Sequence, residues 1–126
     1  MIKKSFSLLE MLIVLGIIAL ILSVLTVSFS TTQKKSRDAK RQGDMKALQN
    51  GLEQYYATCS FTYPTGTLAV GTALTCGGTP IISVMPVDPK SGTGYTYTPS
   101  GTSGFSICTS SLESETPASF CLYNQQ

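Results

Sequence analysis

The stretch KKSFSLLEMLIVLGIIALIL, residues 3–22, decides the fold because it puts a long apolar run almost at the start of the chain. From Met11 to Phe29 there are 19 residues without a charge. An α-helix rises about 1.5 Å per residue, so a run of this length covers the hydrocarbon core of roughly 30 Å. One carboxylate, Glu10, stands directly before the run. We therefore predict a membrane-spanning helix over residues 6–33, with a lone acidic side chain near its start.

The charges on the two sides of the apolar run give conflicting indications of its orientation in the membrane. Lys3 and Lys4 favour a cytoplasmic N-terminus, whereas the basic residues at 34–41 argue for the opposite orientation. A cleaved secretory signal peptide is an alternative, but its apolar core spans about 7–15 residues and a small-residue cleavage site follows. This run is longer and no A-x-A-like site follows it. We expect the run to remain on the mature chain.

The helical pattern continues beyond the apolar run in an amphipathic form, at residues 34–58. Apolar side chains recur there at three- and four-residue spacing, which is typical of a helix that packs one stripe onto a domain. They are Met45, Leu48, Leu52, Tyr55 and Tyr56. No proline precedes Pro64, so we expect one helix from about Phe6 to Ala57. Its weakest part is residues 23–32, where Ser, Thr and Val lower the helix propensity.

The chain beyond residue 58 has the composition of turns and short strands. Four runs rich in β-branched and aromatic residues, separated by Gly, Pro and Ser, favour an antiparallel sheet. They are ISVMPV at 82–87, GYTYTP at 94–99, GFSICTS at 104–110 and ASFCLY at 118–123. The predicted fold class is therefore α+β: a long N-terminal α-helix packed on a small antiparallel β-sheet head at residues 59–126.

Four cysteines lie in the predicted head. They show neither the CxxC spacing nor the histidines of a zinc site, so we expect two disulfides formed in an oxidising compartment. Three connectivities are open. We favour Cys59 with Cys76 and Cys108 with Cys121, because each pair closes a loop inside one local unit. Loops of this length contribute roughly 3 kcal/mol each by the chain-entropy estimate, a useful supplement to a small core.

The composition argues against enzymatic chemistry. The chain has no His, so the commonest general base and metal ligand is missing. The carboxylates Asp88, Glu113 and Glu115 show no recognisable catalytic spacing, and no serine sits in a G-x-S-x-G elbow. A phosphate-cradling glycine motif is also missing from the sequence. We predict a protein that is not an enzyme and uses no metal or cofactor.

The first ten residues combine several features that rarely occur together. A short leader with two lysines and a small residue, Ser5, precedes FSLLE at 6–10, which runs directly into the apolar helix. This arrangement closely resembles the class III signal of type IV pilins and type II secretion pseudopilins. The likeness covers residues 3–30, and it departs from the family at Ser5, where the family almost always has Gly.

The resemblance implies a processing step and an assembly contact. In this family a membrane aspartyl peptidase removes the leader, here residues 1–5, by cutting between Ser5 and Phe6. The same enzyme methylates the new amine of Phe6, and the helix stays on the protein. Glu10 then becomes the fifth residue of the mature chain, where the family places its glutamate. A lone carboxylate near hydrocarbon costs several kcal/mol, so we expect Glu10 to pair with the Phe6 amine of a neighbouring copy. The alternative is a carboxylate held in the headgroup layer as a simple helix N-terminal residue.

Two downstream segments are similar to the same family. Residues 36–56, SRDAKRQGDMKALQNGLEQYY, are similar to the amphipathic second half of the pilin helix. Residues 85–97, MPVDPKSGTGYTY, look like the proline-aspartate-proline and tyrosine segment of major pseudopilins, without the usual Trp and with a longer Gly-rich insert. We therefore do not expect the calcium site of that loop region, and we interpret Asp88 as a turn residue beside Pro89.

The resemblance implies a structural role as a helical homopolymer. We expect a single-pass protein of the inner (cytoplasmic) membrane, with a cytoplasmic N-terminus, that is held in lipid until it is processed by the prepilin peptidase. An inner-membrane assembly platform and motor would then extract it into an extracellular pilus for adhesion, twitching motility or DNA uptake. The alternatives are a major pseudopilin of a type II secretion system and a membrane-anchored extracytoplasmic binding module that does not polymerise.

Five basic residues follow the apolar run, and we call them the basic collar: Lys34, Lys35, Arg37, Lys40 and Arg41. The chain carries a net charge of only +2, so it is not a strongly basic nucleic-acid binder. We expect the collar to meet carboxylates of neighbouring subunits. Attraction of DNA phosphates is the alternative.

Overall fold

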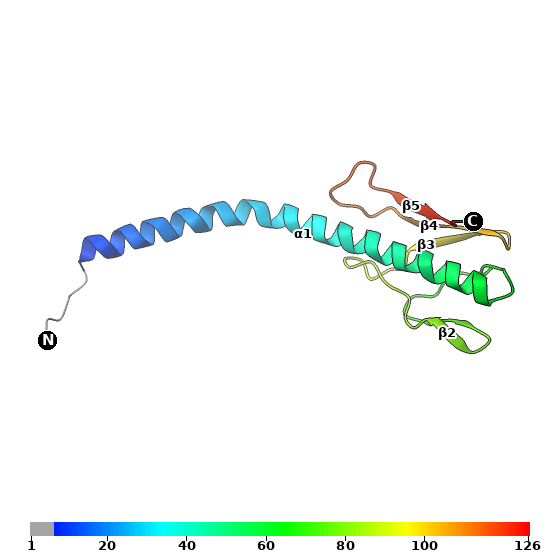
Figure 1. Ribbon diagram of the computed structural model, residues 1–126. Coiled ribbons are helices and arrows are strands. Elements are labelled where there is room, and N and C mark those ends of the chain that lie inside the picture. The colour runs from blue at the N-terminus through cyan, green and yellow to red at the C-terminus, as the bar shows by residue number, and fades with distance from the viewer. Residues whose placement is uncertain (1–6) are drawn as a thin grey trace, which may run out of the picture. The chain divides into compact units, whose positions relative to one another are not determined.

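The computed structural model describes residues 7–126, except for the side chains of residues 25–28. Within that range it contains one helix and five strands (Figure 1): α1 (Leu8–Thr58), β1 (Leu74–Cys76), β2 (Thr79–Ile82), β3 (Thr96–Ser100), β4 (Gly104–Thr109) and β5 (Phe120–Tyr123). The chain divides into two compact units, Met1–Lys34 and Lys35–Gln126. The predicted α+β class, with antiparallel sheets and two disulfides, is confirmed.

Helix α1 agrees closely with the helix that the sequence predicts. It begins after Ser7, whose backbone carbonyl accepts hydrogen bonds from the amides of Glu10 at 3.0 Å and Met11 at 3.3 Å. Its backbone continues through residues 23–32, where the propensity is lowest. A long apolar stretch without Pro explains this continuity, because neither a missing N–H nor a steric clash interrupts the helix.

The structure does not support the prediction that a single helix spans the membrane. Within residues 7–126 the structure has no single helix that is both long enough and apolar enough to cross a bilayer. One bent pair, Leu8–Val24 with Phe29–Thr58, meets the requirement by length and composition only. The membrane role of residues 6–33 therefore stays a prediction.

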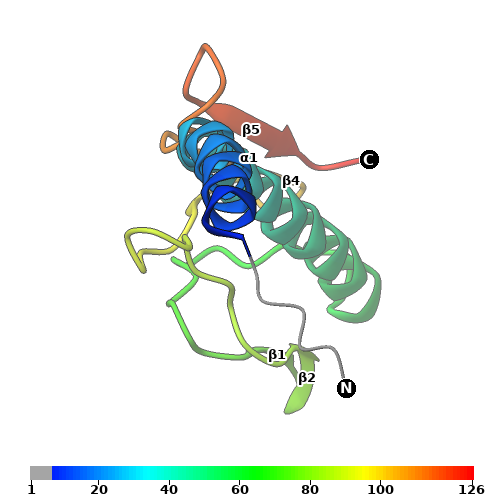
Figure 2. The same ribbon diagram turned by 90° about the vertical axis from the view of Figure 1, so that its left-hand side faces the viewer.

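Two small antiparallel sheets form the β-sheet head. Strands β1 and β2 make a hairpin, and β3, β4 and β5 make a sheet in that order. Figure 2 shows β4 and β5 on one side of the second half of α1 and the β1–β2 hairpin on the other. The hairpin turn is Gly77–Gly78, and both glycines have positive φ, 55° and 88°. Two consecutive positive φ angles suit a tight hairpin turn and favour glycine.

The sequence predicted three strands well and one wrongly. Its runs at 94–99, 104–110 and 118–123 correspond to β3, β4 and β5. The run at 82–87 forms no strand beyond Ile82. Pro86 has no N–H for a ladder bond, and the amide of Met85 donates instead to the carbonyl of Thr72 at 2.9 Å. Met85 is consequently a buried core residue on a loop.

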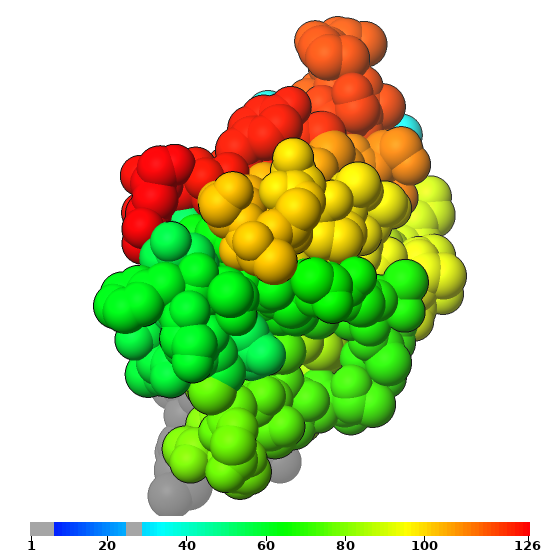
Figure 3. Space-filling model, turned by 90° about the vertical axis from the view of Figure 1, so that its right-hand side faces the viewer, coloured from blue at the N-terminus to red at the C-terminus, as the bar shows by residue number. Residues whose placement is uncertain are grey.

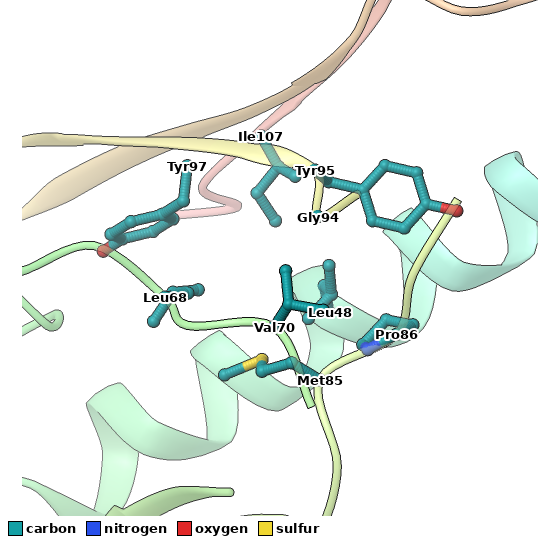
Figure 4. A pocket seen from close by; sticks show the side chains of 9 residues that line it. All are labelled: Leu48, Leu68, Val70, Met85, Pro86, Gly94, Tyr95, Tyr97 and Ile107. Atoms are coloured by element: carbon teal, nitrogen blue, oxygen red, sulfur yellow. The ribbon is translucent and has the colours of Figure 1, made fainter. Parts of the chain in front are cut away.

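The core lies between the second half of α1 and the strands. The predicted stripe supplies the fully or nearly fully buried Met45, Leu48 and Leu52, and the central strand β4 supplies Phe105 and Ile107. Figure 4 shows Leu48, Met85 and Ile107 pointing into one apolar hollow together with side chains of the loops and of β3. This hollow has a cavity volume of about 10 Å³, which is too small for any organic ligand. It is packing space of the core.

Two disulfides fasten the head, with the connectivity that the sequence favoured. Cys59, directly after α1, is bonded to Cys76 at the end of β1, with 5.9 Å between their Cα atoms. Cys108 of β4 is bonded to Cys121 of β5, with 4.2 Å between their Cα atoms. These two residues face each other in the strand register. The first disulfide ties the hairpin to the helix, and the second joins neighbouring strands.

The end of α1 carries a backbone conformation that L-residues rarely adopt. Ser60 and Phe61 have φ angles of 55° and 56°, in the left-handed region. The amide of Phe61 donates to the carbonyl of Tyr56 at 3.1 Å, which closes the helix end. A left-handed residue is a common helix stop, but it is usually Gly.

Replacing Ser60 by Gly should therefore stabilise the protein. The left-handed conformation costs an L-residue about 1–2 kcal/mol, and the greater freedom of Gly in the unfolded chain offsets roughly half of that. We expect a gain of about 0.5–1 kcal/mol in the free energy of unfolding, measured by urea denaturation of the full chain in mild detergent. Gly66→Ala, at a glycine that has no positive φ and open space around its α-carbon, is the control. A loss of stability in Ser60→Gly would contradict the expectation.

Candidate functional site

The first part of α1 exposes a continuous apolar surface. Its large aliphatic side chains are 45–79 % exposed, and they occur at nearly every position. They are Leu8, Leu9, Met11, Leu12, Ile13, Val14, Leu15, Ile17, Ile18, Leu20, Ile21, Leu22 and Val24. A helix that is apolar on all sides is stable in a membrane or at the centre of a helix bundle. This surface is therefore built to be covered by lipid or by other helices.

Glu10 is the only charged side chain in residues 5–33. It lies in the first turn of α1 and is exposed. At a helix N-terminus a carboxylate gains some stabilisation from the helix dipole. Its predicted partner Phe6 and the predicted cleavage residue Ser5 lie outside the described residues. The pairing of Glu10 with the Phe6 amine stays a prediction.

The basic collar divides into two groups. Lys34, Lys35 and Lys40 are exposed, and the structure gives them no ion pair within residues 7–126. Arg37 is half-buried and Arg41 is fully buried, and both form ion pairs with carboxylates of their own chain. For the two arginines, the expectation that the collar meets neighbouring subunits is wrong. They hold the head against the helix instead.

Arg41 is the centre of a buried ionic cluster. Its Nε and Nη2 donate to the two oxygens of Asp88, at 2.5 and 3.3 Å. Its Nη1 donates to Asp38 at 2.7 Å and to Glu113 at 3.1 Å. The side chain is 0 % exposed, and those of Asp38 and Asp88 are 3 % and 4 % exposed. A buried charge of this kind is tolerated only when it is fully paired, which this cluster achieves.

The acidic members of the cluster hold two loops of the head. Asp88 accepts hydrogen bonds from the amides of Lys90 and Ser91, both at 2.8 Å, so it is the turn residue that the sequence indicated. Asp38 of α1 accepts from the amide of Glu113 at 3.0 Å and from the amide and hydroxyl of Ser114. Glu113 also binds Arg37 through both oxygens, at 2.7 and 2.8 Å. The cluster thus fastens the β2–β3 and β4–β5 loops to one face of the helix.

These contacts lower the pKa values of the three carboxyl groups. The hydrogen bond from Arg41 holds the pKa of Asp88 well below its usual range, and the hydrogen bond from Arg37 does the same for the pKa of Glu113. For Asp38 burial alone would raise the pKa, but the hydrogen bonds of Ser114, Glu113 and Arg41 together outweigh it and lower the pKa. All three side chains are therefore charged at neutral pH.

The lowered pKa values predict the pH dependence of stability. A carboxyl group with a lowered folded-state pKa binds its proton more readily in the unfolded chain, so it stabilises the fold above its ordinary pKa of about 4. We expect a constant melting temperature between pH 7 and pH 5 and a progressive fall below about pH 4. Circular dichroism of the detergent-solubilised chain measures it. A melting temperature that is unchanged at pH 2 would contradict the role of the cluster.

Tyrosine hydroxyls make further links, two from loops to the helix and one from β3 to the segment after the helix. Tyr95 donates to Asp44 at 3.1 Å and Tyr63 donates to Glu53 at 2.8 Å. Tyr97 donates to the carbonyl of Pro64 at 2.7 Å, and burial raises its pKa to about 12. Tyr95 and Tyr97 both belong to the segment at residues 85–97. Their structural contacts explain why tyrosines occur there.

Residues 7–126 contain no group of three or more His, Cys, Asp or Glu side chains that could hold a metal ion. Within the same residues, each buried polar side-chain atom has a hydrogen-bond partner. Comparisons with models of known families, with curated proteins and with solved structures find no match for this chain. The candidate functional surfaces are therefore the apolar part of α1, with Glu10, and the exposed lysines of the collar.

Proposed function

We propose that this chain is the structural subunit of a type IV pilus filament. The observation that carries the proposal is the apolar surface of α1, exposed on all sides from Leu8 to Val24, with a lone carboxylate in its first turn. A surface of this kind needs lipid before assembly and other helices after it. The N-terminal resemblance supports the same sequence of states, because it implies that the leader is cut before Phe6 and the helix is kept.

The proposed mechanism has two stages. The apolar helix holds the processed subunit in the inner membrane, with its N-terminus in the cytoplasm and its disulfide-bonded head outside. An assembly platform and motor then pull the subunit out, and the helices form the filament core. Glu10 pairs with the methylated amine of Phe6 on the next copy. Such a contact joins two different surfaces, so it is open-ended, as a filament requires.

The structure supports this proposal through the construction of the head. A subunit that is pulled by its helix needs a head that does not separate from that helix. Here one disulfide, a buried ionic cluster and two tyrosine hydroxyls connect the head to the second half of α1 or its end. These links lie within the C-terminal unit, Lys35–Gln126.

A major pseudopilin of a type II secretion system is the second candidate. The resemblance at residues 85–97 favours it. In the structure Asp88 and Tyr95 of that segment both bind α1. The two candidates differ in where the filament is found. A pilus extends from cells at natural expression levels, whereas a pseudopilus stays in the periplasm and its loss blocks protein secretion.

Electron microscopy of material sheared from the cell surface tests the proposal. We expect thin filaments that contain this chain, and N-terminal sequencing of the filament protein should begin at Phe6. Filaments whose subunit begins at Met1 would contradict processing at Ser5. A chain that stays in the membrane fraction, with neither surface filaments nor a secretion defect on deletion, would contradict both candidates.

A further inference from the structure

Two lysines of the basic collar, Lys34 and Lys35, follow the apolar part of α1 after a short polar spacer. Both side chains are exposed, and no ion pair of residues 7–126 includes them. The spacer, STTQ at 30–33, is polar and uncharged. Two ammonium groups without a carboxylate partner in the described chain therefore come soon after a segment that needs an apolar environment.

The rise of the helix places these two lysines at the depth of lipid headgroups. We take Phe29, the last residue of the apolar run, as the end of the hydrocarbon layer. Lys34 and Lys35 then lie about 7–9 Å farther along the helix, at 1.5 Å per residue. The headgroup layer on one side of a bilayer is about 5–8 Å thick, and the long lysine stem extends the reach of the ammonium group. Lys40 lies about 16 Å beyond Phe29 and Lys46 about 25 Å, so the first two lysines are the ones within reach of lipid phosphates.

The carboxylates of a second copy of this chain are poor partners for the exposed lysines. Asp38, Asp88 and Glu113 already form ion pairs within their own chain. Among the acidic side chains of the C-terminal unit, only Glu115 is exposed, and it accepts a hydrogen bond from the amide of Gln42 at 3.0 Å. It lies in the β4–β5 loop, which stands out from the rest of the head as the topmost orange group in Figure 3. One exposed carboxylate per head cannot compensate the three exposed lysines of the collar.

Duplex DNA is also a weaker fit. A protein that binds the DNA backbone neutralises several phosphates. Arg37 and Arg41 are paired with carboxylates of their own chain, which leaves the three lysines of the collar. No aromatic residue that could stack on a base lies in residues 30–41. A membrane surface needs fewer cations, because an apolar segment supplies most of the binding and each lysine near anionic headgroups adds to it.

We propose that Lys34 and Lys35 bind the headgroup phosphates of anionic phospholipid on the outer face of the inner membrane. The inference rests on the membrane stage of the proposed function and names the lipid partner of that stage. Phosphatidylglycerol suits the two lysines because its phosphate charge is not balanced within the headgroup, whereas phosphatidylcholine carries its own cation. The arginines of the collar then hold the head to the helix, and its first two lysines hold lipid.

Native mass spectrometry of the full chain, released from mixed lipid and detergent micelles, tests the lipid preference. With equal amounts of phosphatidylglycerol and phosphatidylcholine, we expect the unaltered chain to retain phosphatidylglycerol in about 25-fold excess, about fivefold for each lysine. Replacing both Lys34 and Lys35 by Gln should bring this ratio close to one. Replacing both Lys40 and Lys46 by Gln removes the same charge from exposed lysines farther along the helix and should keep the preference.

The outcomes separate this contact from the proposal on which it rests. If the chain is embedded in the membrane but its phosphatidylglycerol preference survives the Lys34 and Lys35 double substitution, the lipid contact is overturned and the filament is not. If the chain is missing from carbonate-washed membranes, the membrane stage of the proposed function fails, and the contact fails with it.

Two competitors identify the source of the phosphate. Neither excess inorganic phosphate nor a short DNA duplex should displace phosphatidylglycerol from the unaltered chain. Displacement by inorganic phosphate would show a site for the free anion, and displacement by the duplex would show a nucleic-acid site. Either result would overturn the lipid contact. The Lys34 and Lys35 double variant should keep the melting temperature of the unaltered chain, because both side chains are exposed, and a lower one would contradict their lack of a partner within the chain.

Discussion

Replacing Arg41 by Met should cost the protein about 3–5 kcal/mol of folding free energy, because it leaves buried carboxylates without their cation. Methionine has a similar length and packs well, so the loss reflects charge rather than volume. The side chains of Asp38 and Asp88, only 3 % and 4 % exposed, cannot recover their hydration without moving. We expect the urea midpoint of the full chain in mild detergent to fall sharply. The near-ultraviolet circular dichroism of the tyrosines should be lost at the same lower urea concentration.

The neighbouring residue provides the control for this prediction. Lys40→Met removes the same charge from an exposed position one residue away, and a surface substitution of this kind changes stability by less than about 0.5 kcal/mol. Arg41→Lys keeps the charge but cannot make the two-pronged contact with Asp88, so its stability should lie between those of Arg41→Met and the unaltered chain. Equal stabilities of the Lys40 and Arg41 variants would show that the cluster does not hold the head.

Replacing Glu10 by Gln should nearly abolish filaments while leaving insertion in the membrane intact. Two opposite charges about 4 Å apart attract by roughly 4 kcal/mol in an effective dielectric of 20, before desolvation. The amide keeps the shape of the side chain and removes this attraction. The measurement is the amount of the chain in sheared filaments, compared with the amount in carbonate-washed membranes. Filaments at the normal level from Glu10→Gln would contradict its role in assembly.

Processing needs a separate control, because an uncut leader would also prevent assembly. N-terminal sequencing of the membrane-bound Glu10→Gln chain should still begin at Phe6. Ser5→Gly introduces the residue that the family usually has before the cut, and we expect it to be processed at least as fast as the unaltered chain. If Glu10→Gln keeps its leader, the loss of filaments reflects processing and not the ion pair.

The parts of the fold that follow from local patterns could be predicted from the sequence. The three- and four-residue spacing of Met45, Leu48 and Leu52 identified the buried face of α1, and the local pairing of cysteines identified both disulfides. The β1–β2 hairpin was missed, although Gly77–Gly78 is a recognisable turn signal. Its strands are only three and four residues long, which is too short for a clear alternating pattern.

The ionic cluster could not be predicted in the same way. Arg41 meets Asp88 from 47 residues away and Glu113 from 72 residues away, and nothing in a single sequence indicates which charges meet across such distances. The basic collar therefore looked like one exposed patch. Arginine is seldom fully buried unless it is paired. Because its partners could not be identified from the sequence, the burial of Arg41 could not be predicted. Only the tertiary structure separates the two inward arginines from the three outward lysines.

The disulfides also determine what a protease could do to this molecule. Cys108 and Cys121 enclose the β4–β5 loop, and Cys59 and Cys76 enclose the segment after the helix. A single cut inside either loop would leave both fragments joined by a covalent bond. In denaturing electrophoresis a nicked head would run at its full mass until it is reduced. In the folded molecule the hydrogen bonds from the backbone amides of Glu113 and Ser114 to Asp38 would keep the severed loop in place. One cleavage would therefore damage the peptide backbone without releasing any part of the molecule.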